Sequence, residues 1–242
     1  MKILGVDIAS NTGWALLKDG KLTKYGMLNI PPEMNMSQKL KFFETNLRKV
    51  LDDTKPDEVH IEDVFLGMSG VKTLAYLARL NGVAMSVCFS KVGDRIKLYQ
   101  PPVWKANSFP GLDGMAKKAE IQVAVIKHFK LIPQSELDIL IKPLSEFTNE
   151  DTKIQKQLDK KKSDLIECNK ILNRKKSSDS DKASASSNKL KLETDIKTLK
   201  QKIDQRKKEI DKIYKSVSIA LTARCGLTAD VSDSIGIAYC NL

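Results

Sequence analysis

The sequence predicts an α/β protein: a mixed sheet flanked by helices, with an inserted antiparallel helical hairpin. Three observations predict this architecture. Strand and helix patterns alternate over the first 130 residues, two heptad-like arms follow from about residue 150, and a short helix of small and apolar residues comes after them. Alternating strands and helices are typical of a sheet with helices on its faces. Paired heptad arms joined by a polar turn are typical of a helical hairpin.

Five short apolar segments are expected to form the strands, at residues 3–7, 13–17, 22–28, 58–64 and 95–100. Short turns such as "KDGK" separate the first three, which predicts an antiparallel meander. A helix between the third and fourth strands allows the fourth to lie parallel beside the first. Asp7 and Glu62 would then lie at the carboxyl ends of neighbouring strands, where sheets of this class usually bind ligands.

Helical spacing of apolar residues predicts helices over 37–53, 71–90, 116–129 and 229–240. In the first of these, Leu40, Phe43 and Leu47 fall on one face. Gly226-Leu227-Thr228 precedes the helix over 229–240 and predicts its N-terminal cap. These helices supply the layers that flank the sheet.

The hairpin is predicted from two arms with apolar residues at spacings of three and four. One arm contains Ile154 and Leu158, the other Ile196 and Ile203, and Lys161 and Arg206 are the polar exceptions. The segment "KKSSDSDKASASSNK" between the arms has no apolar residue larger than Ala, so it predicts a turn. The expected domains are therefore 1–150 with 216–242 as the core, and 151–215 as the hairpin.

The net charge of +11 indicates a polyanionic partner. Most of it lies in residues 150–215, where 20 Lys and Arg face 12 Asp and Glu. The alternative interpretation is a solvated, lysine-rich helix surface.

The four cysteines form no CxxC pair, which favours reduced thiols and a cytoplasmic location. No apolar run reaches membrane-spanning length and no signal peptide is visible, so no membrane association is expected.

Four carboxylates are candidates for one site. Asp7 stands where a buried strand would carry an apolar residue, and an isolated buried carboxylate is costly. Asp230 and Asp233 are three residues apart and share a helix face. Taken singly, each acid has a simpler explanation as a turn, strand-end or helix-first-turn residue. Together with Glu62 they predict a site for Mg²⁺, which prefers oxygen ligands, and two such ions form a device for phosphodiester cleavage.

Four sequence blocks resemble a known family. The blocks "ILGVDIASNTGWAL", "HIEDVFLGMSGVKTLAYLARLNGVAM", "QPPVWKANSFPGLDGMAKKAEIQVAV" and "TADVSDSIGIAY" occur in this order. They resemble the blocks of the RuvC family of Holliday-junction resolvases, which have the ribonuclease H-like fold. The resemblance covers most of residues 1–130 and 227–242.

The resemblance implies a homodimeric endonuclease of DNA recombination and repair that binds branched DNA, namely four-way junctions, and hydrolyses two strands symmetrically. It implies two Mg²⁺ per active site, with Mn²⁺ as a substitute, and a dimer helix near 71–90. The residues carried over from the family are the metal ligands Asp7, Glu62, Asp230 and Asp233, the catalytic Lys118 near the scissile phosphate, and the DNA-binding Phe65, Lys105, Lys117 and Lys118. Two alternatives stay open: Lys117 instead of Lys118 beside the phosphate, and Phe65 as a core residue.

Two departures from the family leave alternatives open. The final block has Ser-Ile-Gly-Ile where the family usually has Ala-Leu-Ala-Ile, so Gly236 either loosens the helix or permits close packing. The family connects its third block to the final helix with a few residues, whereas this chain uses about 94, residues 133–226. The hairpin within this connection is either a DNA arm or a surface for dimerisation or a protein partner.

Other function classes remain as alternatives. They are a non-catalytic DNA-binding or scaffold protein and a nuclease of the same fold that acts on RNA. A sugar-kinase or actin-like ATPase is disfavoured, because a second Gly-rich phosphate loop and a duplicated domain are absent from the sequence.

Overall fold

The computed structural model describes residues 1–64, 70–173 and 179–240, without the side chains of 147–150 and 179–182. The chain divides into two compact units. The first comprises Met1–Ile139 and Ser218–Leu242, and the second, here called the hairpin unit, comprises Leu140–Val217. The segment 151–215 lies within the hairpin unit. Among the described residues, no helix has both the length and the apolar character required to cross a bilayer.

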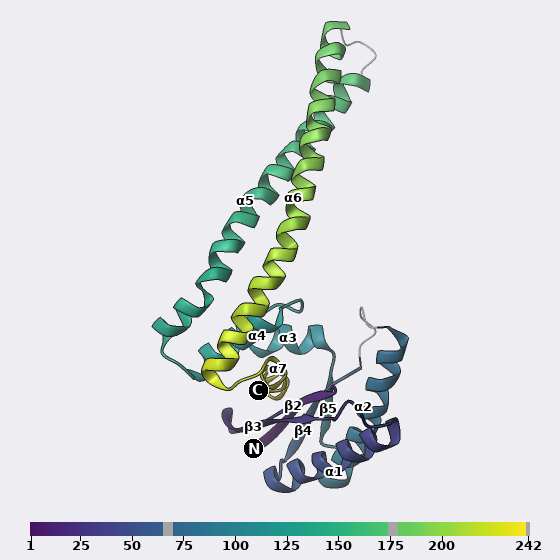
Figure 1. The fold of residues 1–242 in the computed structure, drawn as a ribbon, viewed down its shortest axis with the longest axis vertical. Helices are drawn as coiled ribbons and strands as arrows, with labels where there is room; N and C mark the ends of the chain where they lie inside the picture. Colours follow the sequence, from purple (N-terminus) through teal and green to yellow (C-terminus); the bar gives the residue numbers. More distant parts are fainter. Residues whose placement is uncertain (65–69, 174–178, 241–242) are drawn as a thin grey trace. The chain divides into compact units, whose positions relative to one another are not determined.

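The described residues form a mixed five-stranded sheet in the order β3-β2-β1-β4-β5. Strands β1 (Lys2–Asp7), β2 (Asn11–Lys18) and β3 (Lys21–Asn29) form the predicted antiparallel meander. Strand β4 (Glu58–Glu62) pairs parallel with β1, and β5 (Ile96–Tyr99) pairs parallel with β4. The expected class, a mixed sheet flanked by helices, is confirmed, and so is the parallel placement of the fourth strand beside the first (Figure 1).

Helices α1 (Met36–Thr54) and α2 (Val71–Val92) cover one face of the sheet (Figure 1). Asn35 caps α1, since its side chain accepts from the Gln38 backbone N–H while the Gln38 side chain accepts from the Asn35 backbone N–H. Apolar side chains from both helices and from β1 and β4 form the main core. Its fully buried members include Leu4, Phe43, Leu47, Ile61 and Leu80.

Helix α7 (Ala229–Tyr239) lies on the other face of the sheet (Figure 1). Thr228 caps it, as predicted, by accepting from the Val231 N–H. The helix approaches the sheet so closely that a Cβ on Gly5 would lie 2.0 Å from the Ser234 carbonyl oxygen. A Cβ on Gly13 would lie 2.1 Å from the Asp230 carbonyl oxygen. Gly13 therefore lets the acidic first turn of α7 lie against the start of β2, and Gly5 lets the later turns pack closely on β1.

Helices α3 (Pro101–Ser108) and α4 (Lys118–Phe129) complete this side of the first unit. The sequence did not predict α3, although the Pro pair at its start is a favoured helix beginning. Helix α4 starts at Lys118 rather than at Ala116, because Lys117 still has extended backbone angles. The strand predicted over 58–64 ends at Glu62.

The hairpin unit consists of parts of two long helices, α5 (Gln134–Asn173) and α6 (Asp179–Cys225). Helix α5 begins well before the expected arm and continues through Pro143. Helix α6 already includes residues 179–189, which were expected to form a turn. The first turn of α5 and the end of α6 belong to the first unit, where Glu136 forms an ion pair with Arg224.

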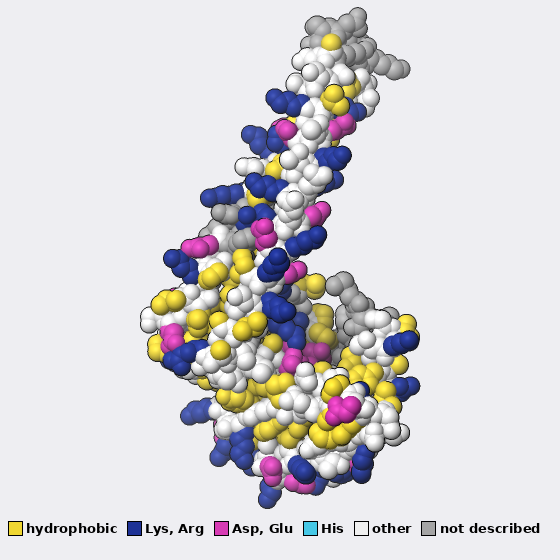
Figure 2. Space-filling view, in the orientation of Figure 1, with side chains coloured by type: hydrophobic (Ala, Val, Ile, Leu, Met, Phe, Trp, Pro, Cys, Tyr) yellow, Lys and Arg dark blue, Asp and Glu magenta, His cyan; other side chains and the backbone are white. Residues whose placement is uncertain are grey.

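The two polar exceptions in the arms form ion pairs between the helices. Arg206 Nε lies 2.5 Å from Asp151 Oδ1, and Lys161 Nζ lies 2.6 Å from Asp195 Oδ2. From Asp151 to Lys161 along α5, the paired residue on α6 moves back from Arg206 to Asp195, so the two helices are antiparallel. Apolar side chains of the arms are buried between these pairs and beside them; they include Ile154, Leu158, Ile196 and Val217. Lys and Arg side chains project along the outer surface of the hairpin unit (Figure 2).

Candidate metal centre

Asp7 is the last residue of β1 and is only 8% exposed. Its backbone pairs with Gly13 of β2, and the following turn is closed by Thr12, whose hydroxyl donates to the Ala9 carbonyl (2.7 Å). Burial raises the pKa of the Asp7 carboxyl well above its ordinary range, and the charges of Asp233 and Glu62 raise it further. The strand therefore presents a carboxylate in a place that disfavours its negative charge.

Asp230 and Asp233 reach the same place from the first turns of α7. One oxygen each of Asp7, Asp230 and Asp233 lie within 4.8 Å of one another, and we call these three residues the acid cluster. Asp233 is 7% exposed, and its Oδ1 is buried without a hydrogen-bond partner in the part of the chain that the structure describes. Burial raises the pKa of Asp233 to about 7, against the opposing charge of Lys118.

The donor set of the acid cluster fits a hard divalent cation. All donors are carboxylate oxygens, which suit Mg²⁺, Mn²⁺ or Ca²⁺ better than softer metals. A cation would supply the partner that the buried Asp233 oxygen lacks, and it would offset the repulsion among the three acids. The residues present therefore fit a metal ion.

Glu62 ends β4, the strand next to Asp7. It is outside the group of three ligand atoms, but its charge contributes to the raised pKa values of Asp7 and Asp233. Burial also raises the pKa of Glu62, although a hydrogen bond from Trp104 opposes this. Trp104 Nε1 donates to Glu62 Oε2 at 2.7 Å, and Asn81 Nδ2 donates to the Glu62 carbonyl at 3.2 Å.

Neither Trp104 nor Asn81 was singled out from the sequence. The available signal for Trp104 was general: a buried indole N–H usually finds an acceptor. For Asn81, the signal was a polar residue on the apolar face of a predicted helix.

Among the basic residues expected from the sequence, Lys118 contacts the acid cluster. Its Nζ donates to Asp230 Oδ1 at 2.6 Å from the first position of α4. Burial alone would lower the pKa of this ammonium group, but the hydrogen bond to Asp230 and the surrounding carboxylates raise it above its ordinary value. The side chain is still 61% exposed, so a charged group from solution can reach it.

The other expected DNA-binding residues differ in position. Lys117 is exposed at the N-cap of α4, and its backbone N–H donates to Glu120 Oε2 (2.6 Å). Lys105 Nζ donates to the Ala116 carbonyl (3.3 Å) and lies 5.6 Å from the centroid of the Trp104 ring. Phe65 lies outside the described residues.

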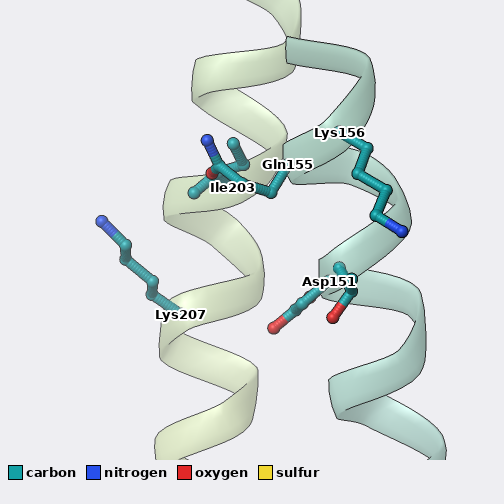
Figure 3. Close-up of a pocket in the computed structure, with 6 residues that line it drawn as sticks. Asp151, Gln155, Lys156, Ile203 and Lys207 are labelled. Carbon is teal, nitrogen blue, oxygen red and sulfur yellow. The ribbon is translucent and has the colours of Figure 1, made fainter. Parts of the chain in front are cut away.

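A separate groove of about 410 Å³ lies between α5 and α6 in the hairpin unit. Figure 3 shows its lining, which includes Asp151, Gln155, Lys156, Ile203 and Lys207. Asp151, the carboxylate among its described lining residues, already forms an ion pair with Arg206. The described lining of the groove contains no second acid to hold a metal, so the acid cluster remains the candidate site.

The family model described as "Crossover junction endodeoxyribonuclease RuvC" matches residues 3–139, which is more than half of the chain. The chain belongs to the RuvC family. The match includes β1, β4, α3 and α4, and therefore Asp7, Glu62 and Lys118. It ends before α7, so Asp230 and Asp233 lie beyond the matched residues.

Curated RuvC proteins are similar to this chain over part of its length. The crossover junction endodeoxyribonuclease RuvC of Bordetella avium is 34% identical over 90 residues, which are 35% of this chain and 49% of that protein. The RuvC of Finegoldia magna is 26% identical over 144 residues, or 56% of this chain and 85% of that protein. Against relatives such as the Bordetella avium protein, the chain spans about half of the relative's length.

A solved structure of Thermus thermophilus RuvC in complex with a Holliday junction substrate is also similar. It is 18% identical, with a TM-score of 0.47, and the similarity covers 57% of this chain and 87% of that chain.

Proposed function

We propose that this chain is a metal-dependent endonuclease that resolves four-way DNA junctions by paired phosphodiester hydrolysis. The observation that carries the proposal is the acid cluster, in which three carboxylates from β1 and α7 converge and one buried oxygen has no partner among the described residues. Membership of the RuvC family supports the reaction class, and the excess of Lys and Arg supports a nucleic-acid substrate.

In this proposal Asp7, Glu62, Asp230 and Asp233 hold two Mg²⁺ ions, for which Mn²⁺ substitutes. When bound, the ions would make water a stronger nucleophile and stabilise the charge that develops on the phosphodiester and its leaving oxygen. The buried position of Asp7 suits a central ligand, because its carboxylate keeps a fixed direction at the end of a packed strand.

The basic residues would bind and orient the DNA backbone. Lys118, which stays protonated at neutral pH and is exposed on one side, would hold the scissile phosphate next to the acid cluster. Lys117 would contact phosphates further from the reaction, and Lys105 would contact the DNA backbone from α3, where its Nζ also donates to the Ala116 carbonyl. Phe65 is proposed to stack on a base of the opened junction.

A homodimer would bring two acid clusters to the two strands that must be cut. Support comes from α2, where Val71, Ala75, Ala78, Gly82 and Phe89 are exposed and fall on one helical face. Val71 is 79% and Phe89 63% exposed, so this face offers apolar surface to a second copy of the chain. Leu74 and Leu77 of the same helix are partly exposed.

The proposal is tested with the purified chain and a labelled four-way junction. Cleavage products are expected with Mg²⁺ or Mn²⁺ and none with a chelator. The variant Asp7→Asn should bind the junction with near-native affinity and fail to cleave it, since it removes a central ligand. Full cleavage by this variant would overturn the site assignment.

The same assay distinguishes the alternatives. A non-catalytic DNA-binding or scaffold protein would bind the junction and leave it intact under all metal conditions. A nuclease specific for RNA would cut a matched RNA junction or an RNA–DNA hybrid and leave the DNA junction intact. Duplex DNA of the same sequence serves as the control for structure selectivity.

A further inference from the structure

Trp104, on α3, contacts the metal-centre strand β4 through Glu62 and the metal-centre helix α7 through Gly236. It is fully buried on α3, and its N–H donates to Glu62 Oε2 at 2.7 Å. An indole N–H only donates, so it binds one oxygen of the carboxylate and leaves the other oxygen for a further partner. Trp104 therefore restricts the direction in which Glu62 points.

The same indole ring packs against the backbone of α7. A Cβ on Gly236 would lie 2.6 Å from Trp104 Cζ3, closer than any real contact of this kind. Gly236 follows Asp233 by three residues, which places both on the same side of α7. Ser108, at the end of α3, donates through its hydroxyl to the Gly236 carbonyl at 2.7 Å. The indole therefore contacts both α7, which carries Asp233, and β4, which carries Glu62, and helps to set the distance between them.

This contact decides between the two explanations for the departure at Gly236. The absent side chain makes room for a large ring, so Gly236 permits close packing. Trp104 and Gly236 are a matched pair: the indole fits only where the helix has no Cβ.

We infer that Trp104 is a positioning residue for the metal centre, which orients the Glu62 carboxylate and sets its separation from Asp233 through contact with Gly236. The inference rests on the proposed function, because it assigns Glu62 a role as a metal ligand. Partners that orient metal ligands typically affect metal affinity or activity by about 10- to 100-fold when they are removed.

The test compares metal binding by three forms of the full chain using isothermal titration calorimetry. Trp104→Phe keeps an aromatic ring but removes the N–H, and Mg²⁺ affinity should fall about 10- to 100-fold. Trp14→Phe is the matched control, because Trp14 lies half-buried on β2 and should leave the affinity unchanged. Native affinity in Trp104→Phe would overturn the inference alone. Absence of Mg²⁺ and Mn²⁺ binding by the native chain would overturn the proposed function and, with it, this inference.

A second measurement does not depend on the folding of Trp104→Phe. The chain has two tryptophans, so Trp14→Phe leaves the Trp104 indole as the only one. Its ¹⁵N–¹H resonance should shift during a Mg²⁺ titration, with the same midpoint as the calorimetric binding curve. An indole resonance that does not move at saturating Mg²⁺ would show that Trp104 does not sense the occupied site.

Gly236→Ala tests the packing part of the inference. In the native background it should weaken Mg²⁺ binding, because the new Cβ displaces the indole from Glu62. In the Trp104→Phe background the same change should have little further effect, since the smaller ring leaves room. Equal effects in both backgrounds would contradict a coupled pair.

Discussion

Asp233 connects the protonation of the acid cluster to the stability of the metal-free chain. Its pKa is raised from the ordinary 3.8 to about 7 in the folded state. Between these values the folded chain binds more protons than the unfolded chain, so this group's contribution to the free energy of unfolding decreases as pH rises. Below pH 4 the carboxyl is neutral in both states, so its burial carries no charge penalty. Above about pH 7 the buried carboxylate is charged, and the folded state is destabilised by the full penalty.

Replacing Asp233 by Asn should therefore stabilise the metal-free chain at pH 8 by about 1 to 4 kcal/mol, since each pKa unit corresponds to about 1.4 kcal/mol. The gain should shrink towards zero at pH 4, where the native carboxyl is protonated as well. Thermal unfolding in a chelator at both pH values measures the difference. A gain that is the same at both values would show that burial of the charge is not its origin.

The two adjacent lysines at the start of α4 should have different effects on the reaction. Lys118→Ala should slow cleavage by roughly 10²-fold or more, the usual loss for one preorganised electrostatic contact in a site. Lys117→Ala should lower junction affinity and leave the single-turnover rate near the native value, because its side chain is exposed at the N-cap. Single-turnover cleavage and a binding titration separate the effects. The reverse assignment would require Lys117 to be the residue nearest the reacting phosphate.

Individual residues differ in how far their positions could be predicted. Asp7 was recognisable because an acid interrupts an apolar strand pattern. Asp230 and Asp233 were recognisable because helical spacing puts them on one face. The contacts of Trp104 with Glu62 and Gly236 were not predictable, because they join segments whose distance depends on the packing of α3 against α7.

At the scale of elements, strongly periodic segments were predictable and short or irregular ones were not. The crossover helix α1 implied that β4 lies beside β1, and the structure confirms this pairing. Helix α3 was missed because a short segment with two prolines resembles a loop. The start of α5 was missed because Pro143 usually interrupts a helix, yet α5 continues through it.

Helix α2 carries a prediction about assembly. Ala78 lies in the middle of its exposed apolar face, so Ala78→Arg would place a charge in the proposed dimer contact. The native chain should sediment as a dimer and the variant as a monomer with unchanged thermal stability of the fold. Ala183→Arg, at an exposed position on α6, is the control and should remain dimeric. A variant that stays dimeric would place the interface elsewhere.

At the scale of the whole molecule, the hairpin unit holds most of the excess positive charge. Residues 150–215 contain 20 Lys and Arg against 12 Asp and Glu. Some of these charges fix the pairing of the helices, as the ion pairs of Arg206 and Lys161 demonstrate. The exposed lysines, such as Lys153, Lys156 and Lys160, are available for an external polyanion.

Replacing Leu140–Val217 by a short Gly-Ser linker should leave a folded dimer that still cleaves junctions at low salt. Its junction affinity should be lower and should depend less on salt, because fewer counterions are released when fewer phosphates are neutralised. Binding titrations at several salt concentrations and sedimentation measure both properties.

A charge variant separates electrostatics from assembly. Changing Lys153, Lys156 and Lys160 to Gln keeps the hairpin and should reproduce part of the loss in salt dependence. If the linker variant instead keeps the native affinity and salt slope but becomes monomeric, the hairpin is a dimerisation arm.

The order of the elements along the chain has a consequence for synthesis. Asp7 and Glu62 precede the hairpin unit, whereas Asp230 and Asp233 follow it. At about 5–20 residues per second, a ribosome needs roughly 4–16 seconds to make the hairpin unit. By then the five strands have been synthesised, but α7, which covers Gly5 and Gly13 in the finished fold, has not. A nascent chain therefore has no complete acid cluster until the hairpin has been translated and α7 has left the ribosome.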